Sequence, residues 1–169
     1  MIRDELQHVA LGMQVNYQGI FNLSDLLAMI DGFFKKKGYV KKIESHNETV
    51  TEKGRAVSLR LRPYKASKSN KLEIQVWVNI TELTDFQKKI DGIPVRLNKG
   101  KVNITIDCFV IYNMRGQWEA RAEYTFIRTL FDKYLFRSKG KDFEGMVKSD
   151  AVDLKNEIAS SLNLNKFLF

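Results

Sequence analysis

The spacing of apolar residues changes at Gly38, and this change constrains the fold more than any other feature of the chain. Before Gly38, the stretch 22–37 places apolar residues three and four positions apart, as one face of an amphipathic helix does. After Gly38, long stretches alternate apolar and polar residues, which is typical of strands with one buried face. The apolar face of the predicted helix consists of Leu23, Leu26, Leu27, Ile30, Phe33 and Phe34.

Both ends of this helix carry residues that start or stop helices. Asn22 is a preferred N-terminal cap, and Asp25 follows it at the spacing of a capping box. Three lysines in the last turn complement the negative end of the helix dipole, and Gly38 can take the left-handed conformation that ends a helix. An alternating stretch at 12–21 precedes the cap, so we expect a strand there.

Six segments after Gly38 are predicted to be strands of one antiparallel meander. The fourth segment is short and contains Pro94, so we expect it at an edge or beside a bulge. A three-residue loop at 114–116 ends in glycine, as a hairpin loop with a bulge does, and it joins the last two strands. The six segments are 39–50, 55–64, 71–82, 93–97, 102–112 and 117–126.

Two helices are expected to close the chain, at 127–137 and at 147–162, with a polar connection at 138–145 between them. With 169 residues and no proline-rich linker, residues 1–169 have the length of one domain. The predicted fold class is α+β: a strand, a helix, a six-stranded antiparallel meander and C-terminal helices packed on the sheet. The apolar face of the last helix consists of Val147, Ala151, Leu154, Ile158 and Leu162.

The order of these elements resembles the helix-grip, or START-like, fold, in which a curled antiparallel sheet wraps a C-terminal helix. The resemblance covers most of the chain and rests on the order of the elements. It implies a carrier or sensor of an apolar small ligand, held between the sheet and the C-terminal helices. The predicted break in the C-terminal helix at 138–145 departs from that pattern.

Residues with catalytic or metal-binding chemistry are few. His8, His46 and Cys108 cannot together make a Cys/His zinc site. The sequence contains no phosphate-binding loop, dinucleotide-binding glycine motif or nucleophile elbow. Cys108 lies on the apolar side of its strand, where a buried and inert thiol is the ordinary outcome. We therefore expect no catalytic residue, metal or cofactor, and enzymatic activity stays an open question.

The sequence has the features of a cytoplasmic protein. Its single cysteine cannot form an internal disulfide, which fits a reducing compartment. Residues 1–14 lack the charged-then-apolar order of a signal peptide. No apolar run approaches the roughly 18 residues needed to span a bilayer. We expect a cytoplasmic location and no transmembrane segment.

The 114–116 loop sets a register in which Asp107 faces Glu123 on the polar side of the last hairpin. The two carboxylates could be an acid–base pair or a divalent-cation site, or part of a solvated face neutralised by Arg121. On the apolar side, this register brings small side chains together, which leaves space for a helix or for an apolar ligand. The candidate apolar pocket consists of Cys108, Tyr112, Trp118, Ala120, Ala122 and Tyr124.

Trp77 lies on the polar side of the predicted strand 71–82. The loop before this strand allows Arg62 to pair with Glu73 and places Trp77 near Arg60. An exposed tryptophan beside arginines suits the stacking of nucleic-acid bases. The alternative is that another strand or a partner subunit covers it. The candidate stacking residues are Trp77, Arg60 and Arg62.

The distribution of lysines is the most informative feature for function. Connections of an up-and-down meander alternate between the two ends of the sheet, and ten lysines fall at one end, among them Lys99 and Lys101 in an expected turn. Because the net charge is +8, such a pole is an electrostatic footprint for a polyanion, although lysine-rich loops also keep proteins soluble. The ten are Lys35, Lys36, Lys37, Lys41, Lys42, Lys65, Lys68, Lys71, Lys99 and Lys101.

Three functions are compatible with these features. The first is a non-catalytic binding module whose lysine-rich pole binds a polyanion such as nucleic acid. The second is the carrier or sensor of an apolar ligand that the helix-grip resemblance implies. The third is a structural or assembly subunit that docks through its apolar C-terminal tail, Phe167–Phe169. The oligomeric state stays open.

Overall fold

The computed structural model describes residues 5–67, 70–112 and 137–168. Within these residues the fold is α+β, as predicted, because antiparallel strands form one sheet and two helices pack on it. The predicted loop 114–116, strand 117–126 and nearly all of helix 127–137 lie outside the described residues. The elements are β1 (Glu5–Phe21), α1 (Leu23–Lys36), β2 (Ile43–Thr51), β3 (Gly54–Leu61), β4 (Tyr64–Ala66), β5 (Asn70–Ile90), β6 (Ile93–Tyr112) and α3 (Arg137–Leu168).

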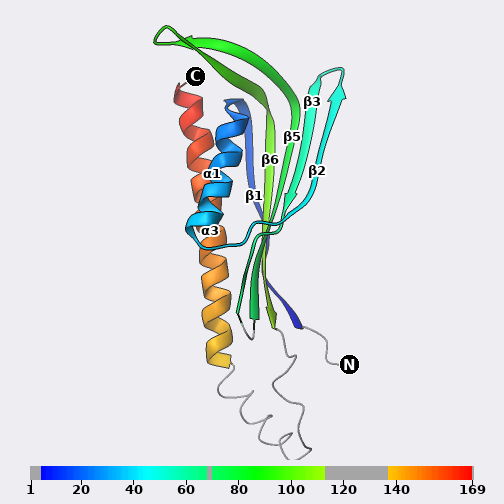
Figure 1. The fold of residues 1–169 in the computed structure, drawn as a ribbon, viewed down its shortest axis with the longest axis vertical. Helices are drawn as coiled ribbons and strands as arrows, with labels where there is room; N and C mark the ends of the chain where they lie inside the picture. The colour runs from blue at the N-terminus through cyan, green and yellow to red at the C-terminus, as the bar shows by residue number, and fades with distance from the viewer. Residues whose placement is uncertain (1–4, 68–69, 113–136, 169) are drawn as a thin grey trace, which may run out of the picture.

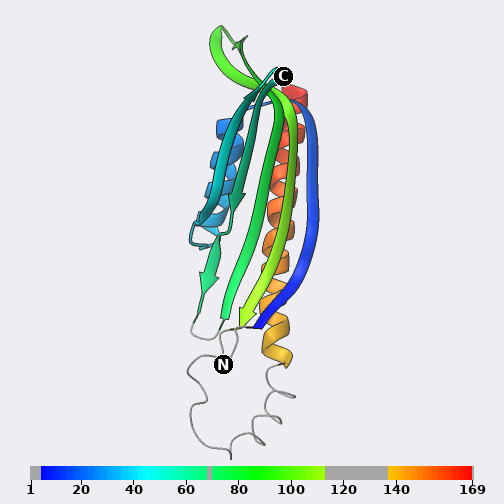
Figure 2. The same cartoon turned by 90° about the vertical axis from the view of Figure 1, so that its right-hand side faces the viewer.

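The described strands form a six-stranded sheet in the order β1–β6–β5–β3–β2, with β4 also paired to β5. Both helices lie on one face of this sheet, here called the inner face (Figure 1). Figure 2 looks onto the opposite, outer face, with the helices behind the strands. Alternate residues of the strands, such as Val76, Val78 and Ile104, join the apolar sides of α1 and α3 in one core.

Strands β5 and β6 form one long hairpin, which corrects the prediction of a separate short strand at 93–97. The turn is the two-residue sequence Asp91–Gly92, in which both residues have a positive φ, of 51° and 80°. Asp-Gly is a strong signal for such a turn. The hairpin also bends where the register shifts between Thr81 and Thr84, and this bulge interrupts the alternation of apolar residues.

Both ends of α1 are formed as predicted. The Asn22 side chain accepts a hydrogen bond from the backbone N–H of Asp25 at 3.2 Å. At the other end, Gly38 has a φ of 79°, and the backbone N–H of Tyr39 donates to the carbonyl of Phe34 at 2.8 Å. This pattern is the Schellman motif, which ends the helix and redirects the chain toward the sheet.

The C-terminal helix is continuous across 138–145, so the predicted break in it is wrong. A Cβ atom at Gly145 would meet no other atom within 4 Å, so this glycine lies where the helix faces open space. A glycine there lowers helix stability by only about 1 kcal/mol relative to alanine, which the packing of the rest of α3 offsets. The predicted apolar face is confirmed, because it is at most 1% exposed at Val147, Ala151, Leu154, Ile158 and Leu162.

Gly54 starts β3 at a place where another side chain would not fit. Its φ is 127°, and a Cβ atom would lie 2.8 Å from the carbonyl oxygen of Leu83. We expect Gly54→Ala to lower the free energy of unfolding by roughly 1–3 kcal/mol, because the backbone must leave this conformation or push β5 away. Urea unfolding followed by circular dichroism measures the change.

Gly32→Ala is the matched control for this substitution. Gly32 lies in the middle of α1, and a Cβ atom there would meet nothing within 4 Å. Alanine should therefore stabilise the helix, by about 1 kcal/mol. Equal effects of the two substitutions would contradict the close approach of Gly54 to β5.

Candidate functional site

The ten predicted lysines do not form one pole. Lys99 and Lys101 lie inside β6, opposite Thr84 and Thr81 of β5, and not in a turn. Lys71 lies near the other end of β5, about 40 Å from Thr84 at the usual rise of about 3.3 Å per residue. The predicted turn is absent because the β5–β6 hairpin turns at Asp91–Gly92 and β6 runs through this region without interruption.

Half of the ten lysines are already held by carboxylates. Lys41 contacts Asp31 at 2.6 Å, Lys71 contacts Glu73 at 2.9 Å, and Lys101 contacts Glu82 at 2.8 Å. Lys37 and Lys65 contact Asp150 at 3.0 Å and 3.3 Å. Lys68 lies outside the described residues. Those without an ion pair to any described residue are Lys35, Lys36, Lys42 and Lys99.

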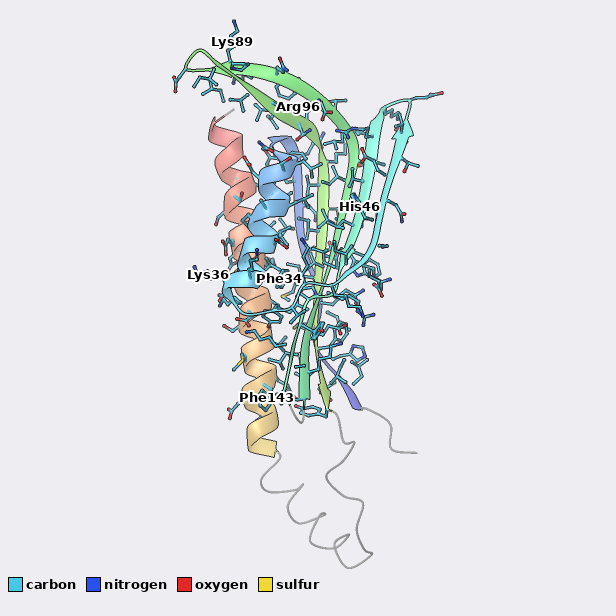
Figure 3. All side chains as sticks on the ribbon, viewed as in Figure 1. Phe34, Lys36, His46, Lys89, Arg96 and Phe143 are labelled. Carbon is cyan, nitrogen blue, oxygen red and sulfur yellow. The ribbon has the colours of Figure 1, made fainter. Side chains whose placement is uncertain are left out.

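Three of these lysines, Lys35, Lys36 and Lys42, lie where the chain passes from α1 to β2, and we call them the α1–β2 lysines. Lys35 and Lys36 end α1, and Figure 3 shows Lys36 at that end of the helix. The carbonyl of Lys42 accepts a hydrogen bond from the backbone N–H of Arg62 at 2.8 Å, which ties the connection to the end of β3. The helix end and the sheet edge therefore hold these lysines near one another.

A pocket of about 260 Å³ lies beside the α1–β2 lysines. Lys35, Lys41 and Lys42 supply its basic side. Tyr39, which is buried, packs edge-on against the ring of Phe34 at 5.5 Å between ring centroids. The pocket therefore combines an apolar floor with a charged rim, in which Asp31 is paired with Lys41. The floor consists of Phe34, Tyr39, Leu61 and Pro63.

Asp150 of α3 is a buried carboxylate that binds side chains of this region. It is 6% exposed, and its carboxylate accepts a hydrogen bond from the Tyr39 hydroxyl at 2.8 Å. Burial alone would raise the pKa of Asp150, but the hydrogen bonds from Tyr39 and Lys37 outweigh it and hold the pKa below its usual value. Burial, followed by the bond to Asp150, raises the pKa of the Tyr39 hydroxyl. Asp150 is thus a structural anion that joins α1, β4 and α3.

The lowered pKa of Asp150 predicts a pH-dependent contribution to stability. Asp150→Asn should lower the free energy of unfolding by about 2 kcal/mol at neutral pH, because the hydrogen bonds to a charged group are weakened. In the unfolded chain the carboxyl has a pKa of about 3.9. The difference from the native protein should therefore be complete above about pH 4 and shrink as the pH falls through the lower, folded-state pKa. Chemical unfolding at a series of pH values measures it.

Asp153→Asn is the control, because Asp153 also contacts Lys37, at 2.9 Å, but half of its side chain is exposed. An exposed pair contributes about 1 kcal/mol or less. A difference between Asp150→Asn and the native protein that stays constant down to pH 2 would contradict the assignment of the lowered pKa to Asp150.

Trp77 is 40% exposed on the outer face. The guanidinium carbon of Arg60 lies 4.4 Å from its ring centroid, so the predicted proximity of these residues is confirmed. Arg62 contacts Glu73 at 2.6 Å, which confirms that pairing as well. Glu44 contacts both arginines, at 2.7 Å and 3.1 Å. Both guanidinium groups are thus already neutralised, and base stacking on Trp77 stays a prediction.

Glu73 is a carboxylate at this end of the sheet that is paired with two basic side chains. Its side chain is only 3% exposed. Burial favours a raised pKa, but hydrogen bonds from Lys71 and Arg62 outweigh it, so the pKa of Glu73 is lowered. Glu73 therefore remains a carboxylate that holds Lys71 and Arg62 in place.

The candidate apolar pocket is described only at Cys108 and Tyr112, because Trp118, Ala120, Ala122 and Tyr124 lie outside the described residues, as do Arg121 and Glu123. Cys108 is fully buried, in the same core as the apolar face of α3. Asp107 accepts a hydrogen bond from the backbone N–H of Gly12 at 2.6 Å, at a bulge in β1. Across the described ranges, no group of three or more histidine, cysteine, aspartate or glutamate side chains could hold a metal ion.

Cys108 should be inert in the folded protein. Burial raises the pKa of its thiol, and no part of the residue is exposed to solvent. We expect no reaction with Ellman's reagent under native conditions and the release of one equivalent of thiolate after unfolding in guanidinium. Rapid labelling of the native protein would contradict the packing of α3 over β6.

No family model matches this sequence, and no curated protein shows significant sequence similarity to it. The resemblance to the helix-grip fold stays a prediction. Among the described helices, none has the length and apolar character needed to cross a membrane.

Proposed function

We propose that this protein is a non-catalytic binding module that holds a polyanion, such as single-stranded nucleic acid, on the α1–β2 lysines. The observation that supports this function is the absence of carboxylate partners for Lys35, Lys36 and Lys42 among the described residues. Neighbouring lysines are paired, so the three ammonium groups are those that an anionic ligand can neutralise.

The acidic residues near this site are already engaged. Asp31 is bound by Lys41, and Asp150 and Asp153 are bound by Lys37. Lys65 adds a further positive charge beside Asp150. The local balance is therefore positive, and phosphate groups gain attraction there by releasing their counterions.

The chemistry of the three side chains favours phosphates over base edges. An ammonium group is a compact point charge on a flexible stem, whereas sequence readout in nucleic acids favours arginine and side-chain amides. Binding through the α1–β2 lysines is therefore expected to depend on salt and little on sequence. The apolar floor beside them, with Phe34 and Leu61, can cover the uncharged part of a bound chain.

Lys35→Gln, Lys36→Gln and Lys42→Gln in one variant test this proposal. The native protein should bind a fluorescein-labelled oligouridylate, and the logarithm of its affinity should fall against the logarithm of salt concentration with a slope of about −2, as expected for three phosphate contacts on a single strand. This slope corresponds to about a 20-fold loss between about 50 and 200 mM salt. In the triple variant, the affinity at low salt should drop and the slope should approach zero. Fluorescence anisotropy measures both.

The control variant replaces Lys53, Lys89 and Lys99 by glutamine. These lysines are exposed and lie outside the α1–β2 connection, between β2 and β3, in β5 and in β6, and the substitution lowers the net charge by the same amount. It should leave most of the affinity intact. Equal losses in the two variants would mean that overall charge, and not the α1–β2 site, attracts the oligonucleotide.

A further inference from the structure

The outer face of the sheet carries a row of amide and hydroxyl side chains that crosses five strands. Residues directly opposite each other in antiparallel strands point to the same side of the sheet. Pairing places Asn16 opposite Asn103, Asn103 opposite Asn79, and Asn79 opposite Ser58. At a strand spacing of about 4.8 Å, the row is about 19 Å long. Its five members are Asn16, Asn103, Asn79, Ser58 and Asn47.

A second row lies beside the first and contains Trp77. Because Trp77 and Asn79 are two residues apart in β5, they are neighbours on the same face. Thr105 of β6 and Arg60 of β3 flank the indole on either side. The tryptophan therefore lies next to the amides, among polar side chains of the outer face. This row consists of Gln14, Thr105, Trp77, Arg60 and Ser45.

The surface is hollowed beside the first row. An open groove of about 430 Å³ is lined by Asn16, Asn79 and Asn103, together with residues one step further along the same strands. Those further residues include Gln18, Thr81 and Lys101. The groove and Trp77 lie on the same outer face of the sheet, which is the side that Figure 2 shows.

The hydrogen-bonding groups of the row remain partly available. The Asn103 amide nitrogen donates to the Asn16 amide oxygen, and the Ser58 hydroxyl donates to the Asn79 amide oxygen at 2.9 Å. These bonds hold the side chains in place across the strands. They leave the amide nitrogens of Asn16 and Asn79 as donors and the amide oxygen of Asn103 as an acceptor.

The charges nearest the two rows are paired, although Lys99, two residues before Lys101 on the same side of β6, has no ion pair to a described residue. Arg60 is held by Glu44 at 2.7 Å, and Lys101 is held by Glu82 at 2.8 Å. Asp107, two residues beyond Thr105 on the same side of β6, adds a carboxylate that repels anions. The two rows themselves therefore offer donors, acceptors and an aromatic ring, and Arg60, the cation within them, is paired with Glu44, which favours a neutral ligand over a polyanion there.

We infer that this outer face binds a neutral, extended oligosaccharide. A sugar chain carries hydroxyl groups that both donate and accept hydrogen bonds, as the amides do, and its rings have an apolar face that packs on an indole. Arg60 lies over the Trp77 ring, 4.4 Å from its centroid, so one sugar ring stacks on the part of the indole that Arg60 leaves exposed. Asn16, Asn79 and Asn103, in the neighbouring row, bond to hydroxyls of the same sugar chain. The first row crosses five strands, so an extended chain can contact more of its members than a compact one. This inference is independent of the polyanion site, which lies at a different place in the fold.

Isothermal titration calorimetry with cellohexaose, a flat β-1,4-linked glucose chain, tests this inference, with maltohexaose as the curved control ligand. Cellohexaose should bind more tightly, with an affinity unchanged between about 50 and 200 mM salt, because no charge is involved. Trp77→Ala and the double variant Asn79→Ala, Asn103→Ala should each weaken it by about tenfold or more. Trp77→Phe should recover part of the loss, and Thr49→Ala, on exposed β2, should bind as the native protein does.

Several results would overturn the inference. One is that neither cellohexaose nor a flat xylan hexamer, at about millimolar concentration, gives a heat of binding with the native protein or the variants. For this comparison the native protein and the variants must have the same melting temperature. Another is unchanged binding in Trp77→Ala. If hexauridylate binds in place of the sugars and Trp77→Ala abolishes that binding, the face belongs to nucleic acid. If the protein is a dimer that Trp77→Ala dissociates, the face belongs to a second copy of the chain. The α1–β2 triple variant must retain sugar binding, so that failure of one proposal is separable from failure of the other.

Discussion

The contact between α3 and the inner face of β1 and β6 is the interaction on which the rest of the structure depends. It fully buries the apolar face of α3 against strand residues such as Ile104 and Ile106. Because side chains alternate along a strand, the residues between these apolar positions must point to the opposite side. The helices cover one face, and the strands of the sheet therefore present Trp77 and Asn103 on the other. The alternation of side chains along the strands thus produces both the packed inner face and the polar outer face.

The positions of the acidic residues decide which cations can meet a ligand. Asp150, Asp31 and Glu73 each hold one or two basic side chains, and their own pairing holds α1, β3 and β4 together. A net charge of +8 therefore says little about where an anion would bind. The α1–β2 lysines have no ion pair to a described residue because the carboxylates near them are paired with other basic side chains. The charged neighbours of Trp77, in contrast, are neutralised by one another.

Several local features could be predicted from the sequence because their causes are local. The cap at Asn22, the left-handed Gly38 and the apolar face of α3 each depend on residues a few positions apart. The pairing of Arg62 with Glu73 followed from a short connection between neighbouring strands. The β5–β6 hairpin was predicted wrongly because a bulge at 81–84 and the polar residues after it hide the alternation that would mark one long strand. The continuity of α3 across Gly145 was missed because helix packing offsets a glycine that, in isolation, favours a break.

The sequence by itself determined the fold class, the ends of α1 and the residues that face the core, since each follows from the period of apolar side chains and from short-range hydrogen bonds. Only the tertiary structure decided which lysines are free and which residues share a row on the outer face. Ion pairs such as Lys37–Asp150 join residues more than a hundred positions apart. The alignment of Asn16 with Asn103 and Asn79 depends on strand register across the whole sheet. The ion pairs and the strand register both depend on which distant segments pack together, and no local pattern in the chain encodes them.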